Sequence, residues 1–168
     1  IARWTDEVFS LGAIRSDGAD DGTRIPVLSD NGVGNSSKAT YTSLQEALDG
    51  YGITEFREPT WIPEGYRFEH VEVDSWSDNG SFIGLYAEYR SKTDSLHIKI
   101  ERYEGSANIQ VEKTDTPVET FLVDGLTVYL LENIGNNSAA WVTEHYECYI
   151  SGTAEKQVLK QIVLSAYV

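Results

Sequence analysis

Segments with strand character, separated by turn signals, follow one another from residue 66 to residue 151 of this chain. The clearest is the segment 96–101, in which Leu96, Ile98 and Ile100 alternate with polar residues, as in a strand with one buried face. Asp124-Gly125, between two such segments, is typical of a type I′ hairpin. The same reasoning predicts strands over Tyr66 to Asp74, Phe82 to Arg90, 107–112, 118–123, 126–132, 139–143 and 146–151.

Helices are expected on both sides of this strand region. Ser43 and Glu46 form a capping box that predicts a short helix over Leu44 to Tyr51. Thr153 is expected to cap a terminal helix over Ala154 to Ser165, whose apolar stripe comprises Val158, Leu159, Ile162, Val163 and Ala166. The pattern predicts an α+β fold, in which a curved antiparallel sheet carries the C-terminal helix on one face and a short N-terminal helix is added.

The first forty residues differ in composition from the rest. Trp4, Val8, Phe9 and Leu11 fall at helical spacing. The stretch from Ser16 to Thr40 is then rich in Gly, Asp, Asn and Ser and has few large apolar side chains, which indicates a polar linker. We therefore divide the chain into an N-terminal segment with a linker, residues 1–40, and a single domain, residues 41–168.

Charge restricts the classes of partner. The chain has 13 basic and 27 acidic residues, a net charge of −14. Such a field repels phosphate backbones and anionic lipid surfaces, which argues against nucleic-acid binding and against membrane contact through basic residues. The sequence has no apolar run of about 18 residues that could span a membrane, and it begins at Ile1 without a signal peptide. We expect an anchor upstream of this fragment.

Residue types that perform chemistry are present without the spacing that chemistry needs. Gly32-Val33-Gly34 lacks the remainder of a nucleotide-binding loop, and His70, His97 and His145 show no zinc-ligand spacing. The aspartates of residues 17–21 do not fit a calcium loop. Cys148 is the only cysteine and is expected to be a buried core residue. We predict a protein that is not an enzyme and has no metal or cofactor.

Aromatic residues are the remaining candidates for a site. Tyr86 and Tyr89 lie three positions apart on one predicted strand, and Tyr146 and Tyr149 on another, so one of each pair should point away from the core. Cross-strand packing is the simpler explanation for such tyrosines, and a binding surface for sugar, peptide or protein is the alternative. The candidate interaction surface comprises Trp76, Tyr86, Tyr89 and Tyr149.

Three pieces of the chain carry a resemblance to a known family. These pieces are 61–66 (Trp-Ile-Pro-Glu-Gly-Tyr), 118–125 and 140–152. In these pieces, and in their order and spacing, the chain resembles a bacterial domain-of-unknown-function family, number 4367. The resemblance covers roughly residues 43–168. It implies an extracytoplasmic domain that follows one membrane helix and a cytoplasmic segment, in some members with an anti-sigma-factor arrangement. The family has no established catalytic residues to carry over.

We expect an extracytoplasmic sensing or protein-interaction domain of a membrane-anchored bacterial protein, with an unknown protein or small ligand as partner. The alternative is a carrier of lipid or another small apolar ligand, with a half-barrel that resembles lipoprotein-sorting proteins. A cell-wall glycan hydrolase is a third reading, and it needs two carboxylates facing each other across a cleft. An apolar cavity lined by Phe82, Leu85, Leu96, Ile98 and Leu130 would favour the carrier, whereas a filled core with an exposed tyrosine patch would favour the interaction domain.

Overall fold

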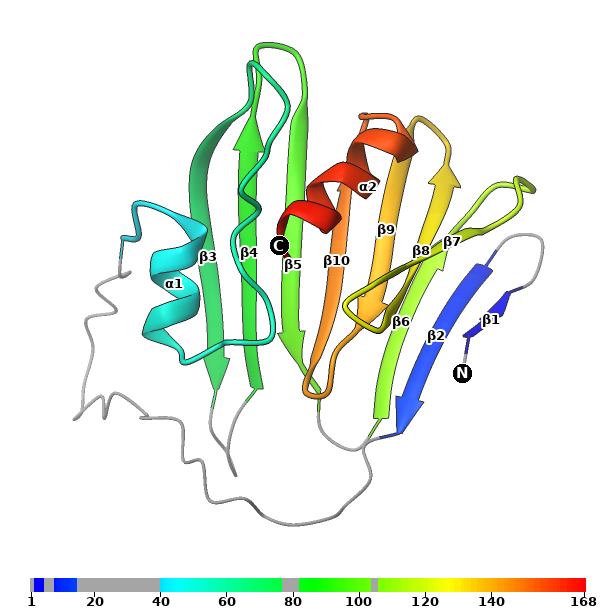
Figure 1. Ribbon diagram of the computed structural model, residues 1–168, viewed down its shortest axis with the longest axis horizontal. Helices are drawn as coiled ribbons and strands as arrows, with labels where there is room; N and C mark the ends of the chain where they lie inside the picture. The colour runs from blue at the N-terminus through cyan, green and yellow to red at the C-terminus, as the bar shows by residue number, and fades with distance from the viewer. Residues whose placement is uncertain (1, 5–7, 15–39, 77–81, 104–105) are drawn as a thin grey trace.

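The computed structural model describes residues 2–4, 8–14, 40–76, 82–103 and 106–168. Within these ranges the chain forms two antiparallel sheets and two helices (Figure 1). An α+β fold that is mostly antiparallel sheet, with a helix at the C-terminal end, is therefore confirmed. No helix in these ranges is long and apolar enough to cross a bilayer.

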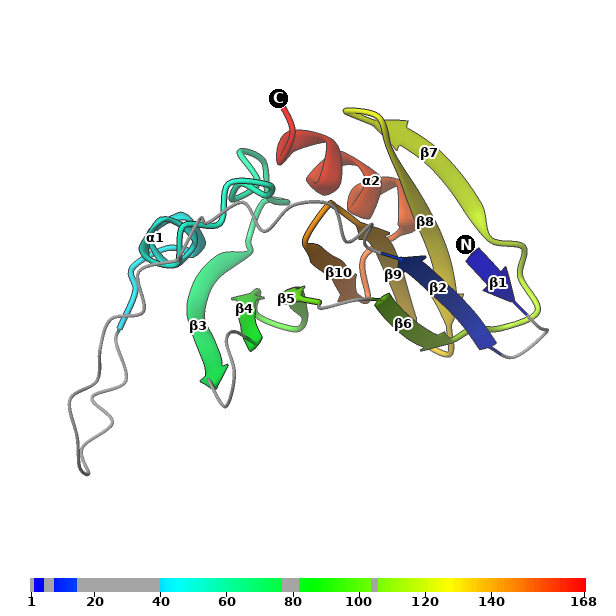
Figure 2. The same ribbon diagram turned by 90° about the horizontal axis from the view of Figure 1, so that it is seen from below.

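The main sheet has seven strands, and β3 and β7 are its edges, so it is not closed. In spatial order the strands are β3 (Arg67–Trp76), β4 (Phe82–Arg90), β5 (Ser95–Arg102), β10 (Tyr146–Gly152), β9 (Asn136–Val142), β8 (Leu126–Asn133) and β7 (Glu119–Val123). The strands lie along an arc when viewed from below (Figure 2). Asp124 and Gly125 both have positive φ, 47° and 77°, as a type I′ turn requires, so the predicted hairpin is confirmed.

A second, three-stranded sheet contains β1 (Ala2–Trp4), β2 (Val8–Ile14) and β6 (Ser106–Glu112). The helical interpretation of the N-terminal segment is therefore wrong. Phe9 and Leu11, which are both buried, fit a period of two as well as they fit helical spacing. This segment is a strand because it pairs with β6, in a register that runs from Val8–Glu112 to Ile14–Ser106. The predicted linker, apart from Thr40, lies outside the described residues.

The helices agree with the sequence in position and differ in one cap. In α1 (Leu44–Gly50) the Ser43 Oγ accepts a hydrogen bond from the Glu46 N–H at 3.1 Å, as the capping box predicts. The helix α2 (Lys156–Ser165) begins after Glu155, which is still extended and makes no side-chain cap. The predicted cap at Thr153 is wrong because its hydroxyl donates to Asp94 Oδ1 at 2.9 Å instead.

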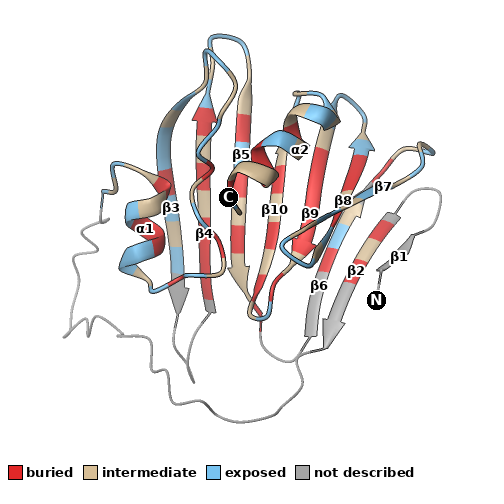
Figure 3. Cartoon of the chain, viewed as in Figure 1, coloured by how far each residue is buried: buried red, intermediate tan, exposed pale blue. Residues whose placement is uncertain are grey.

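Two apolar cores lie on opposite faces of the main sheet. The larger one lies between the sheet and the two helices and includes Trp141, whose Nε1–H donates to the Tyr167 hydroxyl at 2.7 Å. The smaller one joins the three-stranded sheet to β8 and β9 and comprises Phe9, Leu11, Ile109, Leu131 and Ala140. Buried segments accordingly concentrate on the central strands and on the inner sides of the helices (Figure 3).

The described side chains that would line the cavity of a carrier belong to the larger core. Leu85, Leu96, Ile98 and Leu130 are each no more than 2% exposed and pack in the cluster that includes α1 and α2. The side chain of Phe82 lies outside the described part of the chain. These four leucine and isoleucine side chains therefore fill the layer between sheet and helices.

Candidate functional site

A row of long side chains crosses three neighbouring strands on the face opposite the helices. Tyr86 of β4 is paired with Lys99 of β5, and Lys99 is paired with Tyr149 of β10. Side chains directly opposite each other in an antiparallel pair stand about 4.5–5.5 Å apart at Cβ, so the three form one continuous line. Lys99 lies between Ile98 and Ile100, which point into the larger core, so the row belongs to the other face.

The structure places two of the four predicted surface residues in this row, Tyr86 and Tyr149. Tyr89 does not belong to it: its side chain is in the larger core, 3% exposed, and its hydroxyl donates to Glu58 Oε1 at 2.7 Å. The helices cover the side of β4 to which Tyr89 points, which the sequence alone does not reveal. Trp76 ends β3 opposite Phe82, and its side chain lies outside the described residues.

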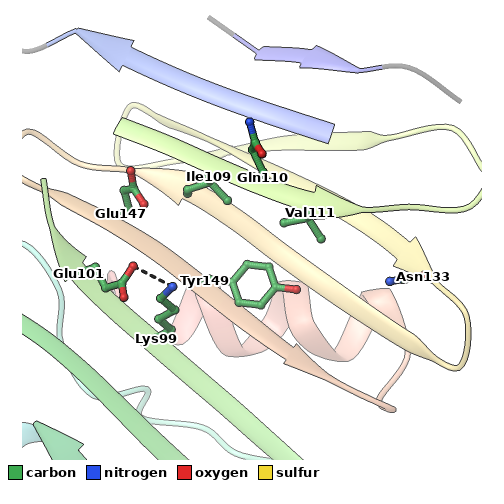
Figure 4. Close-up of a pocket in the computed structure, with 8 residues that line it drawn as sticks. All are labelled: Lys99, Glu101, Ile109, Gln110, Val111, Asn133, Glu147 and Tyr149. Carbon is green, nitrogen blue, oxygen red and sulfur yellow. Dashed lines mark ion pairs between the residues drawn. The ribbon is translucent and has the colours of Figure 1, made fainter. Parts of the chain in front are cut away.

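The row opens onto a groove of about 510 Å³ between the main sheet and β6 (Figure 4). Lys99, Glu101, Glu147 and Tyr149 line it from the main sheet, and Lys99 Nζ pairs with Glu101 Oε2 at 2.7 Å. A second pocket of about 200 Å³ shares Lys99 and Tyr149 and extends to Tyr86. The two pockets together follow the row from β6 to β4.

The opposite wall of the groove is the strand β6. Ile109, Gln110 and Val111 are consecutive residues, and all three line the groove. Since successive side chains of a strand point to opposite faces, a groove that touches all three runs along the edge of the strand. In the described sheet, β6 is the end strand and pairs with β2 on its other side.

Among the residues that the structure describes, acidic groups outnumber basic ones around the groove. Glu101 and Glu147 line it together with Lys99, and Glu88 lines the adjoining pocket. Hydrogen bonds from Arg90, with Nη2–Oε1 at 2.7 Å, hold the pKa of Glu88 below its ordinary value, so this carboxylate stays ionised near neutral pH. The groove therefore favours cationic groups over anionic ones.

The two tyrosines of the row are held by hydrogen bonds. The Tyr86 hydroxyl donates to Glu101 Oε1, and partial burial, followed by this carboxylate, raises the pKa of the phenol. The hydroxyls of Tyr149 and Ser138 lie 2.7 Å apart. Both rings therefore present an apolar body whose polar tip is held by a hydrogen bond, a combination that suits binding surfaces.

Sequence reasoning did not identify Lys99, Glu101 or Glu147 as parts of one site. The alternation of β5 places Lys99 and Glu101 on one face, and this signal was present in the sequence. Their position beside Tyr149 depends on the pairing of β5 with β10, which are more than forty residues apart in the chain. Only the fold brings them together.

The three histidines lie in separate settings. His70 is 3.8 Å from Glu88 and 3.9 Å from Glu72, the ring of His97 is 2.9 Å from Ser95 Oγ, and His145 pairs with Glu55. Within the described ranges of the chain, no group of three or more His, Cys, Asp or Glu is placed to hold a metal ion. Cys148 is completely buried, and burial raises the pKa of its thiol well above the ordinary value, as expected for a core residue.

The fold and this face define a class: an α+β domain with an open antiparallel sheet and a polar, tyrosine-bearing groove along one strand edge. The chain belongs to the family described as domain of unknown function DUF4367, which matches residues 57–165. The matched part contains the complete main sheet, β6 and α2. It therefore includes every residue of the groove and confirms the resemblance noted above. No curated protein matches the chain.

Proposed function

We propose that this chain is a non-enzymatic interaction domain that binds a partner through the groove at the Tyr86–Lys99–Tyr149 row. The observation that carries the proposal is the row itself, which places two hydrogen-bonded tyrosines and a charged pair on a sheet face that no described helix or strand covers at β4 and β5. Tyrosine is favoured at binding surfaces because a large rigid ring is offered at a small cost in side-chain entropy.

The uneven covering of the sheet supports this proposal. In β9, Ser138, Ala139, Ala140 and Trp141 are all buried, because α2 covers one face and the three-stranded sheet the other. In β5 burial alternates, because among the described residues only those on the helix side cover this strand. In the described part of the chain, this open face of β4 and β5 begins next to β10, which β6 contacts. A partner in the groove would therefore meet the main sheet on one side and the edge of β6 on another.

The packing of the larger core supports an interaction domain over a lipid carrier. A carrier needs an apolar cavity, and Leu85, Leu96, Ile98 and Leu130 are packed against other core residues. The groove that is open has charged and amide groups in its lining. It suits a polar or amphipathic partner better than an acyl chain.

We further propose that the domain is extracytoplasmic, is attached to a bacterial membrane by an upstream anchor and takes part in sensing of the anti-sigma type. The family resemblance is the support for this location. The parent gene should then encode, ahead of Ile1, about 20 apolar residues with Lys or Arg on the cytoplasmic side. A cytosolic reading frame without such a segment and without a signal would contradict the location.

Site-specific photo-crosslinking in the bacterium that makes the protein tests the binding face. Gln110 and Gln161 are both exposed glutamines, one lining the groove and one on α2 on the other side of the main sheet. A photoreactive residue at 110 should give a discrete adduct that Tyr149→Ala removes without unfolding the domain, and the same residue at 161 should give none. Equal adducts from both positions, or none from 110, would contradict the proposal.

A further inference from the structure

The wall of the groove is a strand edge as well as a surface. In a sheet the backbone N–H and C=O groups of an end strand alternate toward and away from its partner, so those that point away from β2 face the groove side. Such an edge is a template for another extended chain. This edge of the three-stranded sheet lies next to β10, and it lines the groove with Ile109, Gln110 and Val111.

We infer that the partner enters the groove as an extended, basic segment of another protein, which adds to β6 as a further strand. This inference rests on the proposed function and names the kind of partner that the groove takes. The added strand would extend the three-stranded sheet over the uncovered part of the main sheet. The two sheets would then cover each other across β10, β5 and β4.

The spacing of strands and sheets fits this arrangement. A strand added to β6 lies about 4.8 Å beyond it, and stacked sheets stand about 10 Å apart. The side chain of Tyr149 on β10 already packs against the smaller core. One strand further out, the added chain would lie over β5 and its Lys99, with Tyr86 of β4 next in the row. Alternate side chains of the added strand would point down onto this row.

Charge selects a basic segment. The charged residues that line the groove, within the described ranges, are Glu101, Glu147 and Lys99, and the Lys99 ammonium group is already paired with Glu101. On the neighbouring strand β3, Glu72 is paired with Tyr86 in the register. The whole chain carries a net charge of −14, which draws cationic partners and repels anionic ones.

The tyrosines add a second preference for cations. Lys99 Nζ lies 5.8 Å from the centre of the Tyr86 ring, which is within the range of a cation–π contact. A lysine or arginine of the added strand can make the same kind of contact with Tyr149, whose ring lies at the centre of the groove (Figure 4). The groove therefore recognises an extended segment by its backbone and its alternate basic side chains.

Three labelled peptides test this inference by fluorescence anisotropy on the folded chain. The first is an eight-residue peptide that alternates lysine and valine, the second alternates glutamate and valine, and the third is the first with its amide nitrogens methylated at alternate residues. The lysine peptide should bind about tenfold or more tightly than the other two, a difference of about 1.4 kcal/mol. Methylation keeps charge and side chains and removes the backbone donors on one edge, so it separates strand pairing from charge attraction.

Hydrogen exchange and a matched pair of variants locate the peptide. Binding should slow amide exchange at 109–111 and leave the other sheet edge, 119–123, unchanged. Glu147→Gln should weaken the lysine peptide several-fold, whereas Glu64→Gln, which removes the same charge from an exposed residue outside the groove, should not.

The outcomes separate this inference from the proposed function. Three results would overturn strand addition by a partner. The methylated peptide could bind as tightly as the unmethylated one, or the peptide could slow amide exchange at β7 in place of β6. Sedimentation could also show that two copies of the chain form a dimer through β6. Absence of peptide binding would also overturn it, and an adduct from position 110 in cells would then leave the proposed function standing. Loss of that adduct would remove the proposed function as well.

Discussion

The two faces of the main sheet use the same strands and serve different purposes. On β4, Tyr89 points toward the helices and is buried, while Tyr86, three residues earlier, lines the pocket that adjoins the groove. Both are tyrosines, and both donate a hydrogen bond to a glutamate, Glu58 for Tyr89 and Glu101 for Tyr86. The residue type therefore does not decide what a tyrosine does on this sheet; the element that covers each face decides it.

The hydrogen-bond and ion-pair partners of side chains on the two faces also differ in how easily water can take their place. On the covered face, Tyr89 meets a carboxylate that also accepts from the Gln45 N–H at 2.9 Å, in a small closed network. On the open face, the side chain of Lys99 is 42% exposed where it pairs with Glu101. We therefore expect equal substitutions to cost stability on one face and little on the other.

The largest expected effect lies in the core under the helices. Ile162 of α2 is completely buried, and Ile162→Ala should cost about 2–5 kcal/mol of unfolding free energy, because it removes packed methyl groups and leaves a cavity. Gln161→Ala, at the exposed neighbouring position, should cost less than about 0.5 kcal/mol. Urea unfolding of both variants measures the difference. Equal costs would mean that α2 does not seal this face.

The next effect compares the same substitution on the two faces. Tyr89→Phe removes a buried hydrogen bond to a charged group and should cost about 1.5–3 kcal/mol. Tyr86→Phe should cost about 0.5–1 kcal/mol, because water can reach Glu101 from the groove. Chemical denaturation of the two variants gives both values. A larger cost for Tyr86→Phe would reverse the assignment of the faces.

Alkaline pH provides a third contrast. Burial, and then the bond to Glu58, raises the pKa of Tyr89 above the ordinary value of about 10, so the folded state favours the neutral phenol. This contribution to stability is complete below about pH 10 and is lost as the pH rises through the folded pKa. Unfolding free energies at pH 8 and pH 11 should fall less in Tyr89→Phe than in the unaltered chain. An identical fall in both would mean that Tyr89 does not carry the effect.

The smallest expected effect belongs to the charged pair of the groove. Lys99→Met should change the unfolding free energy by less than about 0.5 kcal/mol. The Lys99 side chain is exposed, and an ion pair with an exposed member is only slightly more stable than the two separately hydrated ions. Thermal unfolding with and without added salt measures this change. A loss above about 1.5 kcal/mol would show that the open face contributes to stability as the covered face does.

Local patterns were predicted correctly where their cause lies within a few residues. The alternation of Leu96, Ile98 and Ile100, the positive φ angles at Asp124-Gly125 and the cap at Ser43 all follow from neighbouring positions. The predictions that failed depended on distant partners. Thr153 bonds with Asp94 instead of capping α2, and the N-terminal segment pairs with β6 as a strand.

The candidate site also has a part that a local pattern predicts and a part that depends on distant contacts. From the sequence alone it follows that one tyrosine of each pair, at 86 or 89 and at 146 or 149, faces away from the larger core, because side chains alternate along a strand. It took the fold to show that Tyr86 and Tyr149 are the two that point away from the larger core, that Lys99 lies between them, and that the edge of β6 borders Lys99 and Tyr149. These facts depend on which strands become neighbours and which face the helices cover. Such contacts join residues far apart in the chain, and no local pattern of side chains specifies them.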